Sequence, residues 1–376
     1  MIFLDNASTT KIYKEALEDY VMFSNNSFYN PSSLYKPGVT VSSQINTARK
    51  SIINLLGGSV FDNLIFTSGA TEANNFAING ILRKNMGKLL FSIAEHPSVY
   101  NVALNLKNLG YNVEFVNILK DGTIDEVDFV KKLDGAAFVS IMHVNNETGA
   151  INNIKRLVEI AKTKNPKIIF HCDGVQAFGK IKVNVSSLGV DLYTISAHKI
   201  HGPKGVGALY IKKGITLKPL MQGGGQEFAL RSGTENTCGI ISFAKACEIS
   251  CKNIETNLKY VAELKELFIS EITKDFSAII NSSENALPYI VSFAVPKVKA
   301  ETILHMAEAE GVLISNGSAC SSKHTDNRIL SAMGIENNII ISSVRVSFSF
   351  DTTKEEVINA CDIIKKTCKN YIKILG

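Results

Sequence analysis

The chain has 376 residues, 45% of them apolar, and a formal net charge of +5. This length suffices for one large and one smaller domain. There is no run of eighteen apolar residues and no basic leader, so we expect neither a membrane span nor a signal peptide. The charge is spread along the chain, which does not favour nucleic-acid binding. Seven cysteines without framework spacing argue against a secreted disulfide scaffold and indicate a cytoplasmic protein.

Strand and helix patterns alternate without interruption from residue 63 to residue 211. The predicted strands are 63–67, 89–93, 113–118, 137–143, 168–172 and 192–196. Further along, we expect a long helix at 253–274, strands at 290–295 and 342–350, and helices at 301–310 and near the C-terminus. The alternation predicts an α/β fold whose central sheet is mostly parallel and covered on both faces. We expect a large domain at 14–255, and a smaller α+β domain at 1–13 and 256–376.

Polar residues follow several of these strand ends. A turn of small residues after the strand 63–67 opens a helix, and free N–H groups there make Ala70 and Thr71 candidates for binding an anion. An ordinary helix N-cap is the alternative at this turn. His96 follows the strand 89–93, where an imidazole can stack on a planar cofactor and move protons near neutral pH. Asn146 follows the strand 137–143 and can donate a hydrogen bond to a cofactor or substrate oxygen.

The segment from residue 173 to residue 207 is where we expect the chemistry. Asp173 follows one strand and Lys199 follows the next, and ligands of α/β folds bind beyond the carboxyl ends of strands. A lysine can hold pyridoxal phosphate (PLP) covalently, while an aspartate can keep its pyridinium nitrogen protonated. Gln176 can reach the ring from the following turn, and Ser196 and His198 are suited to donate to the phosphate. The alternative, a solvated surface lysine, is disfavoured by the apolar strand before Lys199.

Two further residues have unusual surroundings. Cys320 lies among Gly, Ser, Ala, Lys and His residues, and a nearby Lys323 and His324 favour the nucleophilic thiolate. Arg345 lies on a strand whose apolar residues alternate with polar ones, so its guanidinium is fixed on one face and suits two-pronged capture of a carboxylate. An inert buried cysteine and an ordinary salt bridge are the respective alternatives.

The segment S-A-H-K-I-H-G-P-K-G around Lys199 closely resembles the PLP lysine motif of the cysteine desulfurases, the NifS/IscS group of class V aminotransferase-like enzymes. The similarity extends from L-D-N-A-S-T-T at Leu4 to R-V-S-F-S-F at Arg345. It implies the PLP-dependent fold type I, with Thr71 on the cofactor phosphate and Arg345 on the substrate carboxylate. It also implies a homodimer in which Thr234 reaches the PLP phosphate of the other copy.

The resemblance therefore predicts an L-cysteine desulfurase. Lys199 holds PLP, His96 assists proton transfer, and Cys320 takes sulfur from L-cysteine as a persulfide while alanine leaves. The sulfur then passes to an acceptor protein, either an iron–sulfur scaffold or a tRNA-thiolation enzyme. The segment 321–327 departs from the commoner family pattern, which leaves the acceptor open. A selenocysteine lyase, a class V aminotransferase and a non-catalytic scaffold are the alternatives, and the intact Asp173, Lys199 and Arg345 set argues against the last.

Overall fold

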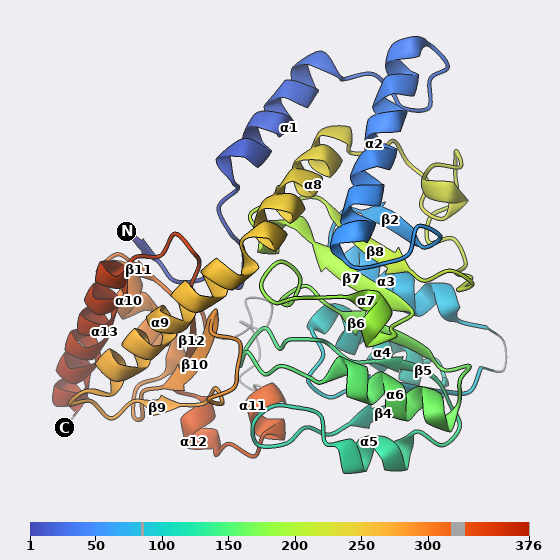
Figure 1. The fold of residues 1–376 in the computed structure, drawn as a ribbon. Coiled ribbons are helices and arrows are strands. Elements are labelled where there is room, and N and C mark those ends of the chain that lie inside the picture. Colours follow the sequence, from blue (N-terminus) through green and yellow to red (C-terminus); the bar gives the residue numbers. More distant parts are fainter. Residues whose placement is uncertain (84–85, 317–327, 376) are drawn as a thin grey trace.

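The structure, a computed structural model, describes residues 1–83, 86–316 and 328–375. Its centre is a seven-stranded sheet (Figure 1). In spatial order the strands are β2 (Asn63–Thr67), β8 (Gly207–Ile211), β7 (Leu192–Ser196), β6 (Ile169–Asp173), β5 (Ala136–Ser140), β3 (Lys88–Ser92) and β4 (Val113–Val116). β8 runs antiparallel to both of its neighbours, and the pairs from β7 to β4 are parallel. The predicted mostly parallel α/β sheet is confirmed.

Helices cover both faces of this sheet because neighbouring strand residues point to opposite sides. Ile65 packs with α3 (Ala70–Ile81) and α4 (Pro97–Asn108) in one core cluster. Phe66, the next residue, packs in a second cluster with α2 (Lys36–Leu55), α6 (Ile154–Lys164) and α8 (Thr237–Lys252). The strands are therefore buried on both faces, and their carboxyl ends are the part of the sheet left available for a site.

A second layer of structure lies beside the sheet (Figure 1). β10 (Ile290–Ala294) pairs antiparallel with β12 (Ser343–Ser347) and β9 (Ile279–Ile280), and α9 (Ile254–Thr273), α10 (Ala300–Ala309) and α13 (Lys354–Leu375) pack with them. The N-terminus joins this layer, because β1 (Ile2–Phe3) pairs with β11 (Val312–Leu313) and Leu4 and Ala7 belong to its core. This grouping agrees with the expected division at residues 14 and 256, which stays a prediction.

Several elements differ from the expected limits. Asp173 is the last residue of β6 and does not follow it. The strand expected at 137–143 ends at Ser140, and beyond that end the backbone N–H of Met142 donates to the Glu95 carboxyl group. The helix α1 (Lys14–Asn26) was not expected, since its apolar Leu17 and Val21 are half exposed and mark no buried face. The remaining short helices are α5 (Glu126–Lys132), α7 (Val185–Leu188), α11 (Arg328–Ala332) and α12 (Asn337–Ile340), with 3-10 turns at Ala197–Lys199 and Glu227–Ala229.

The loop between β8 and α8 is anchored by a buried ion pair. Arg49 donates to both carboxylate oxygens of Glu227 at 2.7 and 2.6 Å, and the Phe66 backbone N–H donates to the same group at 2.8 Å. Glu227, Phe228 and Ala229 all have positive φ, a conformation that costs energy for residues with side chains. The ion pair holds this strained turn in place.

No helix in the three described segments is long and apolar enough to cross a membrane.

Candidate active site

A cavity of about 520 Å³ lies at the carboxyl ends of the parallel strands. Strand ends, the N-terminal segment and β12 all contribute to its wall. The lining residues are Ala7, Ser8, Thr9, Ser68, Gly69, Ala70, Thr71, Glu72, His96, Met142, Asn146, Asp173, Val175, Gln176, Ser196, His198, Lys199, Lys204, Gly205, Val206 and Arg345. The sheet therefore brings together nine of the residues singled out from the sequence as cofactor contacts, with Arg345 joining them from the second layer.

Lys199 lies in the turn directly after β7, and its amine is held by backbone oxygens of the N-terminal segment. Nζ donates to the carbonyls of Ala7 and Ser8, at 2.7 Å each. These residues belong to the L-D-N-A-S-T-T stretch, whose contribution the sequence did not identify. A backbone carbonyl leaves no mark in the residue type, so only the position of the stretch within the family resemblance could have revealed it.

Asp173 and His96 face the same cavity from β6 and from the N-terminus of α4. The Asp173 carboxylate is buried, accepting from the Val175 N–H at 3.0 Å and from Asn74 Nδ2 at 2.7 Å. Burial lowers the pKa of His96, and the positive charges of Lys199 and Arg328 lower it further, while Asp173 opposes them. A neutral imidazole and a carboxylate fixed by hydrogen bonds, both facing the same cavity, are suited to contact a planar, positively charged ring.

One end of the cavity has the groups that an anion requires. Ala70 and Thr71 begin α3, where the first backbone N–H groups have no intrahelical partner and the helix dipole is positive. Ser196 Oγ is buried and has no hydrogen-bond partner in the described part of the chain. His198 closes this end, and burial, with help from neighbouring lysines, lowers its pKa to about 4. These groups fit the phosphate of PLP, and Lys199 and Asp173 fit its aldehyde and its ring nitrogen.

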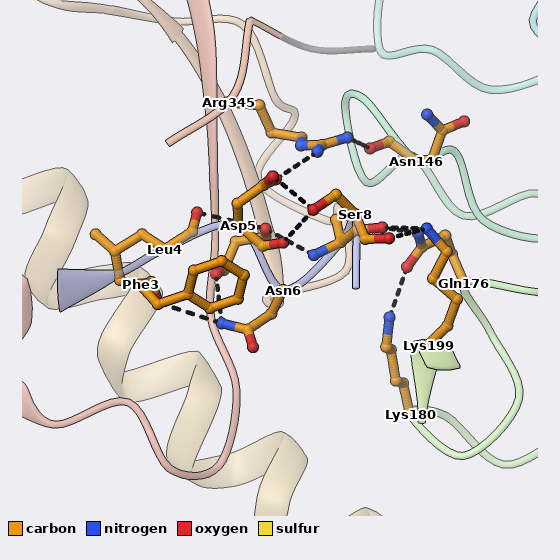
Figure 2. A network of polar contacts seen from close by, with 12 residues as sticks. Phe3, Leu4, Asp5, Asn6, Ser8, Asn146, Gln176, Lys180, Lys199 and Arg345 are labelled. Carbon is orange, nitrogen blue, oxygen red and sulfur yellow. Dashed lines mark hydrogen bonds and ion pairs between the residues drawn. The ribbon is translucent and has the colours of Figure 1, made fainter. Parts of the chain in front are cut away.

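The other end is built around Arg345, whose side chain is 3% exposed. Its guanidinium contacts Asp5 Oδ1 at 2.7 Å and donates to the backbone carbonyl of Asn146 at 2.7 Å (Figure 2). Ser8 Oγ donates to the second oxygen of Asp5 at 2.5 Å, which fixes that carboxylate. The Nε of Arg345 and the side-chain oxygen of Asn146 are buried without hydrogen-bond partners among the described residues. Of these two atoms, the Nε–H of Arg345 is a donor that remains available for a substrate carboxylate.

A buried lysine stands behind the cavity wall. Lys180 is 6% exposed, and its Nζ donates to Gln176 Oε1 at 2.5 Å (Figure 2). Gln176 Nε2 in turn donates to the Ala7 carbonyl at 2.9 Å, the same oxygen that accepts from Lys199. Burial lowers the pKa of Lys180 to about 7, and the positive charges of Lys199 and Arg345 act in the same direction. Apart from its place one turn after Gln176, no sequence pattern singles out Lys180.

Of the predicted residues that the structure describes, Thr234 does not line this cavity. Thr234 lines a smaller neighbouring cavity, which shares Ser68, Gly205 and Val206 with the main one. Within one chain its hydroxyl therefore does not reach the predicted phosphate position. Cys320 lies outside the described residues.

The whole chain resembles known proteins of one kind. Residues 2–359 match the class-V aminotransferase family. The chain is 39% identical over 372 residues to a cysteine desulfurase IscS from Dictyoglomus turgidum, with 97% of this chain and 94% of that protein covered. A solved NifS-like protein is 31% identical with a TM-score of 0.92, covering 98% and 99% of the two chains. The solved structure of SspA in complex with cysteine is 29% identical, with a TM-score of 0.82 and coverage of 93% and 99%.

Proposed function

Because the chain belongs to the cysteine desulfurase group of the class-V aminotransferase family, we propose that its cavity holds PLP and removes sulfur from L-cysteine. The observation that carries this proposal is the convergence of Lys199, Asp173 and Arg345 on one cavity from three different strands. An amine, a carboxylate and a guanidinium in these places suit an aldehyde, a pyridinium nitrogen and a substrate carboxylate. The products are L-alanine and a persulfide on Cys320.

The cofactor would be held along the whole cavity. Lys199 would bind it covalently, Asp173 would keep its ring nitrogen protonated, and Gln176 would contact the ring. The phosphate is bound by a cradle of Ala70, Thr71, Ser196 and His198. When bound, PLP supplies an electron sink for the negative charge that develops on the substrate.

The remaining steps belong to side chains of the protein. Arg345 binds the substrate carboxylate and Asn146 orients it, which places the α-hydrogen toward the Lys199 amine as its proton acceptor. His96 takes part in proton movement at the rim. The Cys320 thiolate forms a bond to the substrate sulfur as the carbon–sulfur bond breaks, so the sulfur stays on the enzyme and the carbon skeleton leaves as alanine.

A homodimer is part of the proposal. Apolar side chains are exposed on α1, in the loop that follows it and at the start of α2, and the loop residues Leu34 and Phe28 are 96% and 68% exposed. The others in this region are Leu17, Val21, Met22, Tyr35 and Val39. An apolar surface of this kind is typical of an interface between subunits. A second copy would also bring its own Thr234 to a phosphate cradle that it does not reach within one chain.

The persulfide on Cys320 would pass to an acceptor protein in the cytoplasm, either an iron–sulfur scaffold or a tRNA-thiolation enzyme. The cysteines in the described part of the chain form no disulfide, which supports a reducing compartment. Co-purification followed by transfer of radiolabelled sulfur identifies the acceptor.

The test of the proposed function uses the purified full-length chain. It should be yellow with bound PLP and should release alanine from cysteine. Cys320→Ala should keep the colour and lose turnover, whereas Lys199→Ala should lose the absorption of covalently held cofactor. Undiminished turnover in Cys320→Ala contradicts the persulfide role, and transfer of amino groups to keto acids without sulfur release identifies an aminotransferase instead.

A further inference from the structure

A continuous chain of hydrogen bonds joins His96 to Asp173 through two side chains that do not line the cavity. His96 Nδ1 and Ser98 Oγ lie 2.8 Å apart. Asn74 Nδ2 donates to the same Ser98 Oγ at 2.8 Å and to Asp173 Oδ2 at 2.7 Å. Asn74 comes from α3 and Ser98 from the first turn of α4, so this chain links two helices and a strand end behind the cavity.

The direction of each hydrogen bond in this chain is fixed. An ionised Asp173 carboxylate only accepts, so the amide nitrogen of Asn74 must face it. The second N–H of that amide is then directed at Ser98 Oγ, which leaves the hydroxyl hydrogen for His96 Nδ1. The backbone N–H of Ser98 donates to the same Nδ1 at 3.1 Å, and a backbone N–H has no acceptor role. Two donors therefore converge on Nδ1, which carries no hydrogen.

The burial of the Asn74 side chain carries a cost that packing of the core does not explain. Asn74 is fully buried, and its Oδ1 has no hydrogen-bond partner within the described residues. An unsatisfied buried oxygen costs stability, so an apolar residue would serve the core better. The Asn74 amide donates two hydrogen bonds, one to Asp173 and one to Ser98, and so connects these two residues.

We propose that Ser98 and Asn74 are positioning residues that hold neutral His96 with its proton on Nε2, so that the ring acts as a hydrogen-bond donor to negative charge in the cavity. This proposal rests on the proposed function and narrows the role of His96. In this tautomer the ring has no free lone pair at Nε2, so it stabilises a developing anion and does not act as a base there. Proton abstraction is then left to Lys199.

The first test reads the tautomer directly and needs no turnover. Full-length protein labelled with ¹⁵N-histidine gives imidazole nitrogen signals, and His96→Gln assigns those of His96. We expect the Nε2–H form in the wild-type protein. In Ser98→Ala we expect a shifted Nδ1 signal, because of the two donors to Nδ1 only the backbone N–H of residue 98 is kept. An Nδ1–H form in the wild-type protein, or an unchanged pattern in Ser98→Ala, overturns the proposal whether or not the enzyme desulfurates cysteine.

The second test measures alanine release with loaded enzyme. Ser98→Ala and Asn74→Ala should each lower kcat roughly 10-fold, because one donor to the imidazole is lost or turned, while KM changes less than about 2-fold. Ser98→Thr keeps the hydroxyl and should restore most of kcat. An unchanged kcat in a variant whose His96 nitrogen signals are altered refutes the positioning role.

Ser140→Ala is the matched control. Ser140 Oγ contacts His171 Nδ1 at 2.8 Å, and both residues are fully buried in the sheet away from the cavity lining. Ser140→Ala removes a serine–histidine contact of the same kind, but the tautomer of His96 and kcat should not change. A loss in Ser140→Ala equal to that in Ser98→Ala would mean that general destabilisation of the sheet, not the tautomer of His96, controls turnover.

Discussion

Lys180→Met should make the cofactor-free protein more stable relative to wild type, and more so at pH 6 than at pH 9. The native pKa of Lys180 is about 7, below its ordinary value of 10.5. In the unfolded chain the amine is charged below pH 10.5, whereas in the native state it prefers to be neutral above pH 7. The cost of burying it is therefore complete below pH 7, declines between pH 7 and pH 10.5, and vanishes above.

The size of the effect follows from that pKa difference. The pKa difference corresponds to a full cost of about 5 kcal/mol for burying the Lys180 amine. Nearly all of this cost is present at pH 6, and about 2 kcal/mol of it remains at pH 9. The substitution also leaves Gln176 Oε1 without its donor, a loss that is the same at both pH values and cancels in the comparison. The stability gained by Lys180→Met should therefore be about 3 kcal/mol greater at pH 6 than at pH 9.

Thermal unfolding of wild type and variant at the two pH values measures this difference. At about 2.1 cal/mol/K for each residue, a chain of this length has an unfolding entropy near 0.8 kcal/mol/K, so about 3 kcal/mol corresponds to about 3–4 °C. Lys265→Met is the control, because Lys265 is also buried but donates to the backbone carbonyls of Ser283, Glu284 and Ala286, away from the cavity. It should lower the midpoint at both pH values. A gain for Lys180→Met that is equal at pH 6 and pH 9, or larger at pH 9, refutes the assignment of a neutral buried amine.

Three further substitutions test the site and the fold. Arg345→Lys replaces a two-pronged donor by a point charge, so KM for cysteine should rise roughly 10- to 100-fold in steady-state alanine release while cofactor absorption persists. Asp173→Asn removes the partner of the ring nitrogen, and turnover should fall by at least about 100-fold, with folding unchanged by circular dichroism. Glu227→Gln leaves the buried Arg49 without its counter-charge, and the unfolding free energy should fall by about 3–5 kcal/mol in denaturant titration. A wild-type KM in Arg345→Lys, a wild-type turnover in Asp173→Asn and a wild-type stability in Glu227→Gln would each contradict the corresponding prediction.

The part of the site that the sequence predicted is the part set by strand ends. Asp173, Ser196 and Lys199 each lie at or just after a strand, and parallel strands bring their carboxyl ends to one edge regardless of the details of packing. Alternation along the strand at residue 345 likewise fixed the face of its arginine. These inferences needed only local pattern and the rule for where ligands bind in such sheets.

The rest of the site depends on contacts between distant segments. The carbonyls of Ala7 and Ser8 reach Lys199 because the N-terminus is held against β12, a pairing with no local signal. Lys180 reads as an ordinary surface lysine, and only its tertiary surroundings bury it. Asn74 reads as one more polar residue in the first turns of a helix, yet it binds Asp173 from across the sheet edge. Propensity and periodicity carry no information on such long-range partners.

The contact between the N-terminal segment and β12 determines when the cavity can be completed during synthesis of the chain. The strand ends from Thr67 to Lys199 are synthesised well before Arg345. Asp5 has no Arg345 to bind until the 340 residues that separate them have been translated, so two distant segments of the nascent polypeptide must meet before the substrate end of the cavity is complete. The substrate end is therefore assembled later than the strand ends at which the cofactor contacts lie.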